Sequence, residues 1–141
     1  MQRTIAATAL FVASIFITTG AWAQSVTATV PFDFTINNNT VVPAGTYIIT
    51  SAPSTEHHVL SISDEKTTYR LSAAMPNPAS GNNTSVLVFH RYGNQYFLSE
   101  IRSDTADMNL HVPVWKSEKQ AMTHMQVAGL PTSNNVTVAT K

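Results

Sequence analysis

The sequence predicts a mainly β fold, a single-domain antiparallel β-barrel or sandwich of about seven strands with one short C-terminal helix. The first observation is that hydrophobic residues after position 24 recur mostly at every second position, which is the period of a half-buried strand. The second is that clusters of Pro, Gly, Asn and Ser separate these runs at short intervals. The third is size, because 141 residues with 43% hydrophobic side chains can form one domain with a core, but not two.

Composition excludes several classes of function. The eight basic and eight acidic side chains cancel, and charged residues make up 11% of the chain against roughly 25% in ordinary soluble proteins. A nucleic-acid-binding protein needs a basic face to neutralise phosphates, so we expect no nucleic-acid partner. Cysteine is absent, which excludes a disulfide framework, a thiolate metal site and a cysteine nucleophile.

An export signal is predicted for residues 1–23, followed by a single β domain over residues 24–141. Arg3 supplies the positive N-terminal region, residues 5–17 carry no charge, and Ala21-Trp22-Ala23 matches a cleavage site. The alternative is an uncleaved membrane anchor, but the apolar stretch is shorter than the ~20 residues of a spanning helix. We therefore expect an exported protein, periplasmic or extracellular, with no membrane span after signal cleavage.

Four strands are predicted in the first half of the β domain, because hydrophobic and polar residues alternate in each of them. They cover residues 26–36, 46–50, 58–63 and 67–73. Pro31 has no N–H to donate, so we expect the first strand to lie at a sheet edge or to contain a bulge there. The Val-Pro-Ala-Gly sequence of residues 42–45 forms a turn before the second strand.

A β-hairpin is the clearest local prediction. Two largely apolar runs, residues 85–92 and 95–102, flank Gly93-Asn94, a two-residue loop that suits a type II′ turn. The resulting register pairs Tyr92 with Gln95, Arg91 with Tyr96, Phe89 with Leu98, and Leu87 with Glu100. Because both faces of this hairpin are largely apolar, we expect it to be central and covered on both sides.

The C-terminal third predicts one short helix and a closing strand. Ser117 and Gln120 fit a capping box, and the following apolar residues share one helical face, so a helix is expected over residues 118–127. Gly129 is a suitable stop signal for it. Residues 136–139 are expected to form the last strand.

Five segments carry a resemblance to a known group of proteins. They are residues 30–34, 43–47, 86–93, 95–101 and 136–139. Together they resemble a group of small exported proteins of acidobacteria-type soil bacteria, over most of the chain that follows the signal. That group has no assigned activity, so the resemblance implies origin and architecture but no reaction. Relatives have an aromatic residue and a glycine-rich turn where Arg102-Ser103-Asp104 stands here, which leaves the register of residues 102–115 open.

The histidines form no metal-binding pattern. His57 and His58 are adjacent on a predicted strand, so their side chains point to opposite faces and cannot share one ion. His90 lies in the hairpin, and His111 and His124 lie in the less regular C-terminal part. Neither H-x-H nor H-E-x-x-H spacing occurs, so we predict no metal and no cofactor.

No catalytic residues are predicted either. The carboxylates considered for glycoside hydrolysis are Asp33, Glu100, Asp104 and Asp107. Glu100 shares a strand face with Arg91 and lies two residues from Arg102, which favours a structural ion pair over catalysis. The sequence contains no G-x-S-x-G motif of a serine hydrolase.

Aromatic residues form the one suggestive set. They are Phe32, Phe34, Tyr47, Tyr69, Phe89, Tyr92, Tyr96 and Phe97. A plain β core explains them, because aromatic residues favour strands. The alternative is a pocket for one apolar ligand, as in small barrels.

The sequence therefore favours a non-catalytic exported envelope or secreted module that acts by binding or association. The alternatives are a small hydrolase of unfamiliar type that uses Asp33 or Glu100, and a carrier of an apolar small molecule. The second apolar face of the hairpin further predicts a homo-oligomer or an envelope protein partner that docks over Tyr92, Phe97 and Ile101.

Overall fold

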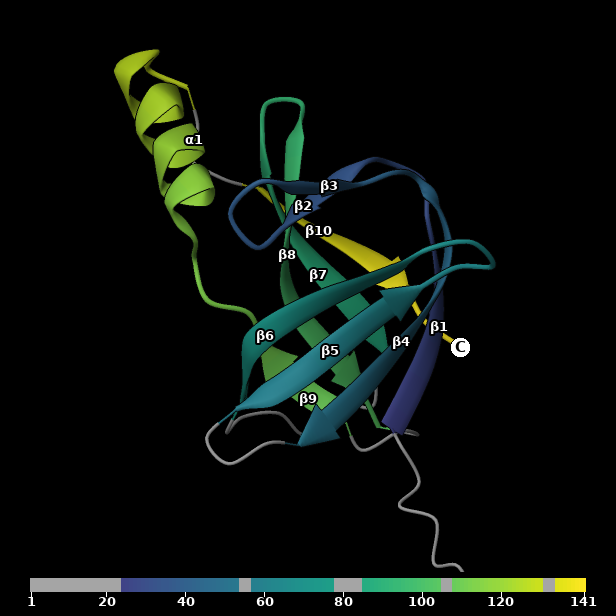
Figure 1. The fold of residues 1–141 in the computed structure, drawn as a ribbon. Coiled ribbons are helices and arrows are strands. Elements are labelled where there is room, and N and C mark those ends of the chain that lie inside the picture. The colour runs from purple at the N-terminus through teal and green to yellow at the C-terminus, as the bar shows by residue number, and fades with distance from the viewer. Residues whose placement is uncertain (1–23, 54–56, 78–84, 105–107, 131–133) are drawn as a thin grey trace, which may run out of the picture.

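The structure, a computed structural model, describes residues 24–53, 57–77, 85–104, 108–130 and 134–141. These residues form a ten-strand, mixed but largely antiparallel open sheet with one helix in the C-terminal region (Figure 1). The prediction of a mainly β fold with one C-terminal helix is therefore confirmed, with more strands than expected. The export signal predicted at residues 1–23 lies outside the described residues.

The elements follow one another along the chain with short connections. They are β1 (Gln24–Val30), β2 (Phe34–Ile36), β3 (Thr40–Val42), β4 (Gly45–Pro53), β5 (His58–Ser63), β6 (Thr68–Pro76), β7 (Val86–Tyr92), β8 (Gln95–Ser103), β9 (Met108–His111), α1 (Lys116–Val127) and β10 (Asn134–Ala139).

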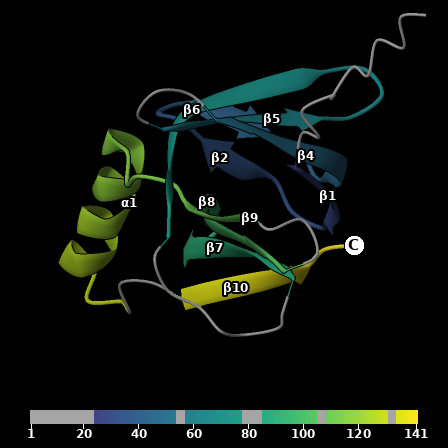
Figure 2. The ribbon, with the colours of Figure 1, turned by 90° about the horizontal axis from the view of Figure 1, so that it is seen from below.

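The sheet has two parts that share β6. Strands β1, β4, β5 and β6 pair in that order, and the end of β6 then pairs with β9. Strand β8 lies between β7 on one side and β9 and β2 on the other, and β7 pairs with β10. The contact between β2 and β8, at Thr35 and Phe97, is parallel. Figure 2 shows β4, β5 and β6 on one side of the molecule, β7 and β10 on the other, and α1 beside them.

The chain end returns to the first strand. Thr140 forms an antiparallel bridge with Ala28. The N–H of Thr27 donates to the carbonyl of Lys141 over 3.1 Å, and the N–H of Lys141 donates to the carbonyl of Thr27 over 2.8 Å. The residues that follow β10 thus lie beside β1.

The main core fills the space between the two parts of the sheet. It is built from residues of every strand from β1 to β9. Phe34 lies at its centre, with edge-to-face contacts to Tyr47 and Phe89. Phe32 stacks on Tyr96 with ring centroids 3.9 Å apart at the margin. Most of the predicted aromatic set therefore belongs to the core.

The strand predicted over residues 26–36 is broken at Pro31. Strand β1 ends at Val30 and β2 begins at Phe34. Proline cannot continue the ladder, which explains the break. Asp33 in the intervening segment accepts a hydrogen bond from the N–H of Ala44 over 2.8 Å, which holds the bend against the turn before β4.

The β7–β8 turn is built as predicted. Gly93 has φ 62°, while Asn94 is not among the residues with positive φ, as a type II′ turn requires. The pairs Tyr92–Gln95, Arg91–Tyr96 and Phe89–Leu98 are also confirmed.

Beyond Leu98 the predicted register is wrong. Val88 pairs with Glu100 and Leu87 pairs with Ile101, so Ser99 is an extra residue in a β-bulge. The bulge changes the face on which the following side chains lie. Ile101 therefore joins Leu98 in the main core, and Phe97 lies on the other face, toward the helix.

Helix α1 begins two residues earlier than predicted, and its predicted capping box is wrong. The N-cap is Trp115, with no side-chain cap bond, and Ser117 lies inside the helix. The N–H of Ser117 instead donates to Oδ1 of Asn38, in the β2–β3 turn, over 3.0 Å. At the other end Gly129 follows the C-cap with φ 69°, which confirms it as the stop.

The sequence did not predict β3 and β9, because both strands are short. Strand β3 has three residues, and β9 has four. Strand β9 settles the register that the sequence left open, since Ser103 pairs with Met108 and Glu100 pairs with His111. Within the described residues, no helix is long and apolar enough to cross a membrane.

Candidate functional site at the junction of helix and sheet

Helix α1 covers the second apolar face of the β7–β8 hairpin. Ala121, Met122 and Met125 pack on Tyr92 and Phe97 in a small cluster separate from the main core. The helix is therefore the cover that the apolar face required.

The predicted docking surface over Tyr92, Phe97 and Ile101 is wrong. These side chains are 3%, 4% and 0% exposed. Helix α1 covers the first two, and the bulge at Ser99 turns Ile101 into the main core. A partner cannot dock on residues that the chain itself buries.

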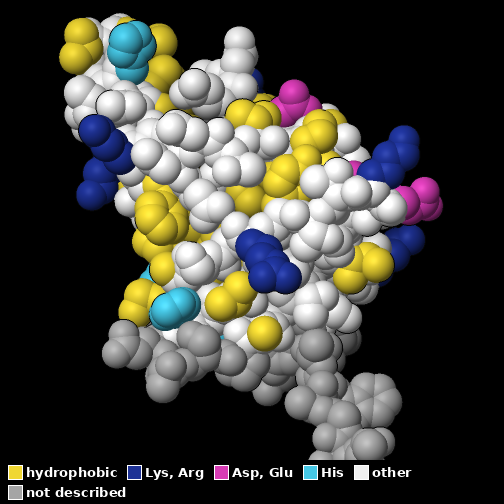
Figure 3. Space-filling model, viewed as in Figure 1, with side chains coloured by type: hydrophobic (Ala, Val, Ile, Leu, Met, Phe, Trp, Pro, Cys, Tyr) yellow, Lys and Arg dark blue, Asp and Glu magenta, His cyan; other side chains and the backbone are white. Residues whose placement is uncertain are grey.

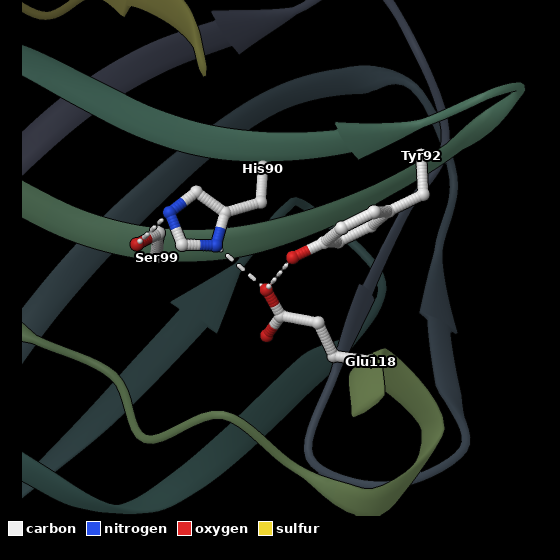
Figure 4. Close-up of polar contacts among 4 residues, drawn as sticks. All are labelled: His90, Tyr92, Ser99 and Glu118. Atoms are coloured by element: carbon white, nitrogen blue, oxygen red, sulfur yellow. Dashed lines mark hydrogen bonds and ion pairs between the residues drawn. The ribbon is translucent and has the colours of Figure 1, made fainter. Parts of the chain in front are cut away.

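A buried carboxylate lies in the first turn of α1. The side chain of Glu118 is 4% exposed. Its Oε1 accepts a hydrogen bond from the hydroxyl of Tyr92 over 3.0 Å and lies 2.6 Å from Nδ1 of His90 (Figure 4). Both partners come from β7, so this one oxygen joins the helix to the sheet.

The bulge adds a fourth member to this group. Oγ of Ser99 lies 3.0 Å from Nε2 of His90 (Figure 4). The carbonyl of Ser99 accepts from the N–H of Val112, 2.7 Å away, which fixes the backbone of the bulge. We refer to Glu118, His90, Tyr92 and Ser99 as the Glu118 cluster.

The electrostatics of the cluster favour a protonated His90. The hydrogen bond to Glu118 raises the pKa of His90 above its ordinary 6.5; burial lowers it, and the charges of Glu118 and Glu100 raise it further. An imidazolium donates from both ring nitrogens, to Glu118 and to Ser99. Burial, followed by the charge of Glu118 and the hydrogen bond to it, raises the pKa of Tyr92, so that phenol stays a neutral donor.

The order Ser99–His90–Glu118 is that of a serine hydrolase triad. Burial opposes this chemistry, because Ser99 is 8% exposed and lines neither of the two main hollows described below. The arrangement is therefore well suited to holding the helix, while its access to a substrate is restricted.

A groove of about 650 Å³ lies on the other side of this junction. Its walls are α1, the β2–β3 hairpin and the β7–β8 turn, and Tyr92 belongs both to the groove and to the Glu118 cluster. Five side chains of its lining are carboxamides, namely Asn38, Asn39, Asn94, Gln95 and Gln120. No Lys, Arg, Asp or Glu lines it. We call it the amide groove.

A second hollow, of about 690 Å³, lies on the outer side of α1. All of its lining residues belong to the helix or to Ala128, which directly follows it. It thus has no second wall and is a weaker candidate site than the amide groove.

The carboxylates singled out by the sequence do not come together. Asp33 binds the N–H of Ala44, and Glu100 forms an ion pair with Arg102, whose Nε donates over 2.7 Å. Asp104 is exposed, and Asp107 lies outside the described residues. Arg91 is not the partner of Glu100; its Nε donates to the carbonyl of Gly93.

The histidines are equally scattered. His58 contacts Oγ of Ser51 through Nδ1, 3.0 Å away, and His124 lies on α1 in the lining of the amide groove. No group of three or more His, Cys, Asp or Glu that could hold a metal occurs in the part of the chain that the structure describes.

The sequence indicates His90 only as a candidate metal ligand, and it assigns no role to Ser99 or Glu118. No spacing in the sequence connects them, because the bulge aims Ser99 and the docking of α1 brings Glu118 to the sheet. The three consecutive Asn residues at positions 37–39 are the local sequence feature that accompanies the groove, and they do not by themselves indicate a binding site. Comparison with protein families, with curated proteins and with solved structures finds no match to the chain.

Proposed function

We propose that the protein is a non-catalytic exported β module that binds a ligand in the amide groove. The observation that carries this proposal is a groove with a wall fixed in place: α1 is fastened by the Glu118 cluster and by Asn38. The ion pair joins the buried Glu118 carboxylate to a His90 side chain that is 27% exposed, and a pair of this kind adds little net stability compared with apolar packing. Its use at this junction supports a role in positioning the helix, as binding sites require of the residues behind them.

Native mass spectrometry of the exported protein tests this function. Asn39→Trp places a bulky ring in the lining of the groove, whereas Ser72→Trp changes an exposed residue of β6 that does not line it. We expect a bound small molecule or peptide on the unmodified protein and on Ser72→Trp, and its loss from Asn39→Trp. A ligand retained equally by all three proteins would place binding elsewhere.

Export is proposed on the features of residues 1–23 and on the resemblance to small exported bacterial proteins. The expected mature N-terminus is Gln24, in the periplasm or outside the cell. The intact mass of the exported protein tests this directly, and a mass that retains Met1–Ala23 would refute cleavage.

We further propose that the sheet closes into a barrel and does not divide into a sandwich. The hydrogen bonds between Thr27 and Lys141 support closure, because they join the first strand to the end of the last. Deleting residues 140 and 141 should increase hydrogen exchange in both β1 and β10. A change confined to β10 would oppose a barrel.

A hydrolase is the second candidate, and the Ser99–His90–Glu118 geometry is the observation that favours it. The test is covalent labelling by a fluorophosphonate, read by intact mass, with Ser99→Ala as the control. Stoichiometric labelling that disappears in Ser99→Ala would establish a reactive serine and overturn the non-catalytic proposal. We expect no labelling, because Ser99 is buried.

A further inference from the structure

The amide groove lies next to a free sheet edge. Strand β3 is the last strand in the pairing order, and among the described strands it pairs with β2 alone. Val41, in the middle of β3, is 59% exposed and lines the groove together with Asn38 and Asn39 of the preceding turn. An edge strand presents unpaired N–H and C=O groups to any chain that lies alongside it.

The lining chemistry matches that of a polypeptide backbone. Each carboxamide has two N–H donors and one carbonyl acceptor, the same groups as a peptide bond. Asn38 uses its Oδ1 for the N–H of Ser117, which leaves its NH2 group as a donor. Apart from Tyr92 and His124, no titratable side chain lines the groove, so it offers no charge to attract a charged ligand.

Charged side chains are also sparse on the face of the molecule drawn in Figure 3, where Lys, Arg, Asp and Glu are scattered among hydrophobic and other uncharged groups. The groove has no electrostatic feature that would select a phosphate, a carboxylate or a basic segment. Recognition there depends on hydrogen bonds and shape.

A neutral sugar chain also offers hydroxyl donors and acceptors, but the aromatic residues of the groove argue against it. Sugar-binding grooves commonly present an open aromatic face for the ring to stack on. Tyr92 and Phe97 are 3% and 4% exposed, because α1 covers them. The groove therefore provides hydrogen-bonding groups at its rim without an open aromatic face.

We propose that the amide groove binds an extended, uncharged polypeptide segment, held through its main chain by the edge of β3 and by the surrounding carboxamides. This inference rests on the proposed function and specifies its ligand. Strand addition to a free edge is an established mode of peptide recognition, in which the main chain supplies the affinity.

The test is an NMR titration of the isotope-labelled mature protein. The probe is an acetylated and amidated peptide of alternating Ser and Val, about eight residues or roughly 27 Å long when extended. We expect shifts in the backbone signals of residues 39–42 and in the side-chain NH2 signals of Asn94 and Gln120. Asn39→Trp should weaken binding by about tenfold or more, and Ser72→Trp should leave it unchanged.

Two further probes decide what the groove recognises. The same peptide with alternate backbone nitrogens methylated cannot donate to a strand edge, and we expect it not to bind. Equal binding of the methylated peptide, or no shift at residues 39–42 with either peptide, would overturn the inference. Binding of maltohexaose in the groove without binding of the peptide would also overturn it, while leaving the proposed binding function intact.

Discussion

Tyr92 contacts α1 in two ways, because its ring packs against the helix and its hydroxyl donates to Glu118. Removing the hydroxyl alone separates the two contributions to stability. Tyr92→Phe keeps the ring that packs on Phe97 and Ala121 but deletes the donor to the buried Glu118 carboxylate. A hydrogen bond to a charged group contributes about 1.5–3 kcal/mol, so we expect a loss of about 2 kcal/mol in the free energy of unfolding. Urea denaturation of the two proteins measures this loss.

Tyr69→Phe is the matched control for this substitution, because Tyr69 is only partly buried at the margin of the core. Its effect should stay within about 0.5 kcal/mol. Equal losses in the two variants would mean that the Tyr92 hydroxyl has no special role in the Glu118 cluster.

His90 makes stability depend on pH. Its pKa is raised in the folded protein above the ordinary 6.5, mainly by the hydrogen bond to Glu118. The folded state therefore holds the proton more tightly than the unfolded chain, and this stabilisation is complete below pH 6.5. It is lost as pH rises through the folded-state pKa.

The measurement is the urea midpoint between about pH 6 and about pH 9 for the protein and for His90→Gln. The difference between the two should shrink as pH rises. A difference that is constant over this range would show that the proton on His90 does not contribute to stability.

Gly93 is the residue whose backbone conformation defines the hairpin turn. Its φ of 62° is strained for any side chain, and a Cβ there would lie 3.9 Å from Sδ of Met125, an ordinary contact. The cost of Gly93→Ala is therefore one of backbone conformation alone, roughly 1 kcal/mol.

Gly45→Ala provides the comparison for the turn. Its φ is not in the left-handed region, and its Cβ would lie 3.5 Å from the Tyr47 ring, again an ordinary contact. We expect its denaturation midpoint to change less than that of Gly93→Ala. The reverse order would mean that the β7–β8 turn tolerates a side chain.

At the scale of elements, α1 depends on a cap from a distant part of the chain. Asn38→Ala removes the acceptor for the N–H of Ser117, and loss of a helix-capping side chain costs about 1 kcal/mol. Circular dichroism at increasing urea should show the loss. Asn39→Ala, in the same turn, is the control and should have little effect, because within the described residues the side chain of Asn39 forms no hydrogen bond to α1.

The local elements could be predicted wherever one segment contains its own signal. The Gly93-Asn94 turn, strand β5 over His58–Ser63, and the end of α1 before Gly129 each follow from a few neighbouring residues. The alternation breaks at Ser99-Glu100, where two polar residues follow each other. This break is a local sign of the bulge, and the predicted register did not use it. The cap on α1, in contrast, could not be predicted, because Asn38 lies 79 residues before Ser117.

The candidate site was beyond sequence reasoning for the same reason. His90 and Tyr92 lie on one strand. Ser99 contacts His90 because of the bulge, and Glu118 contacts His90 because α1 docks on the sheet. The groove is assembled from two hairpins and one helix that are distant in sequence. The absence of Lys, Arg, Asp and Glu from the groove lining agrees with the composition, because only 11% of the residues in the chain are charged.

For the molecule as a whole, a two-part sheet encloses the main core, and one helix packs outside it to form both a small second core and a groove wall. No residue of α1 belongs to the main core as the described residues define it. The groove would not exist without α1, since the helix supplies one wall. Binding, on this account, depends on how firmly the Glu118 cluster holds α1.

Hydrogen exchange of α1 in Glu118→Gln, read by mass spectrometry, tests this dependence most directly. A neutral amide of similar size should weaken the bond to His90, so peptides covering Lys116–Val127 should exchange about tenfold faster or more, while β4 and β5 keep their protection. Glu65→Gln, at an exposed turn, should change neither region. Unchanged protection of α1 in Glu118→Gln would contradict the account, because the helix would then be held in place without the cluster.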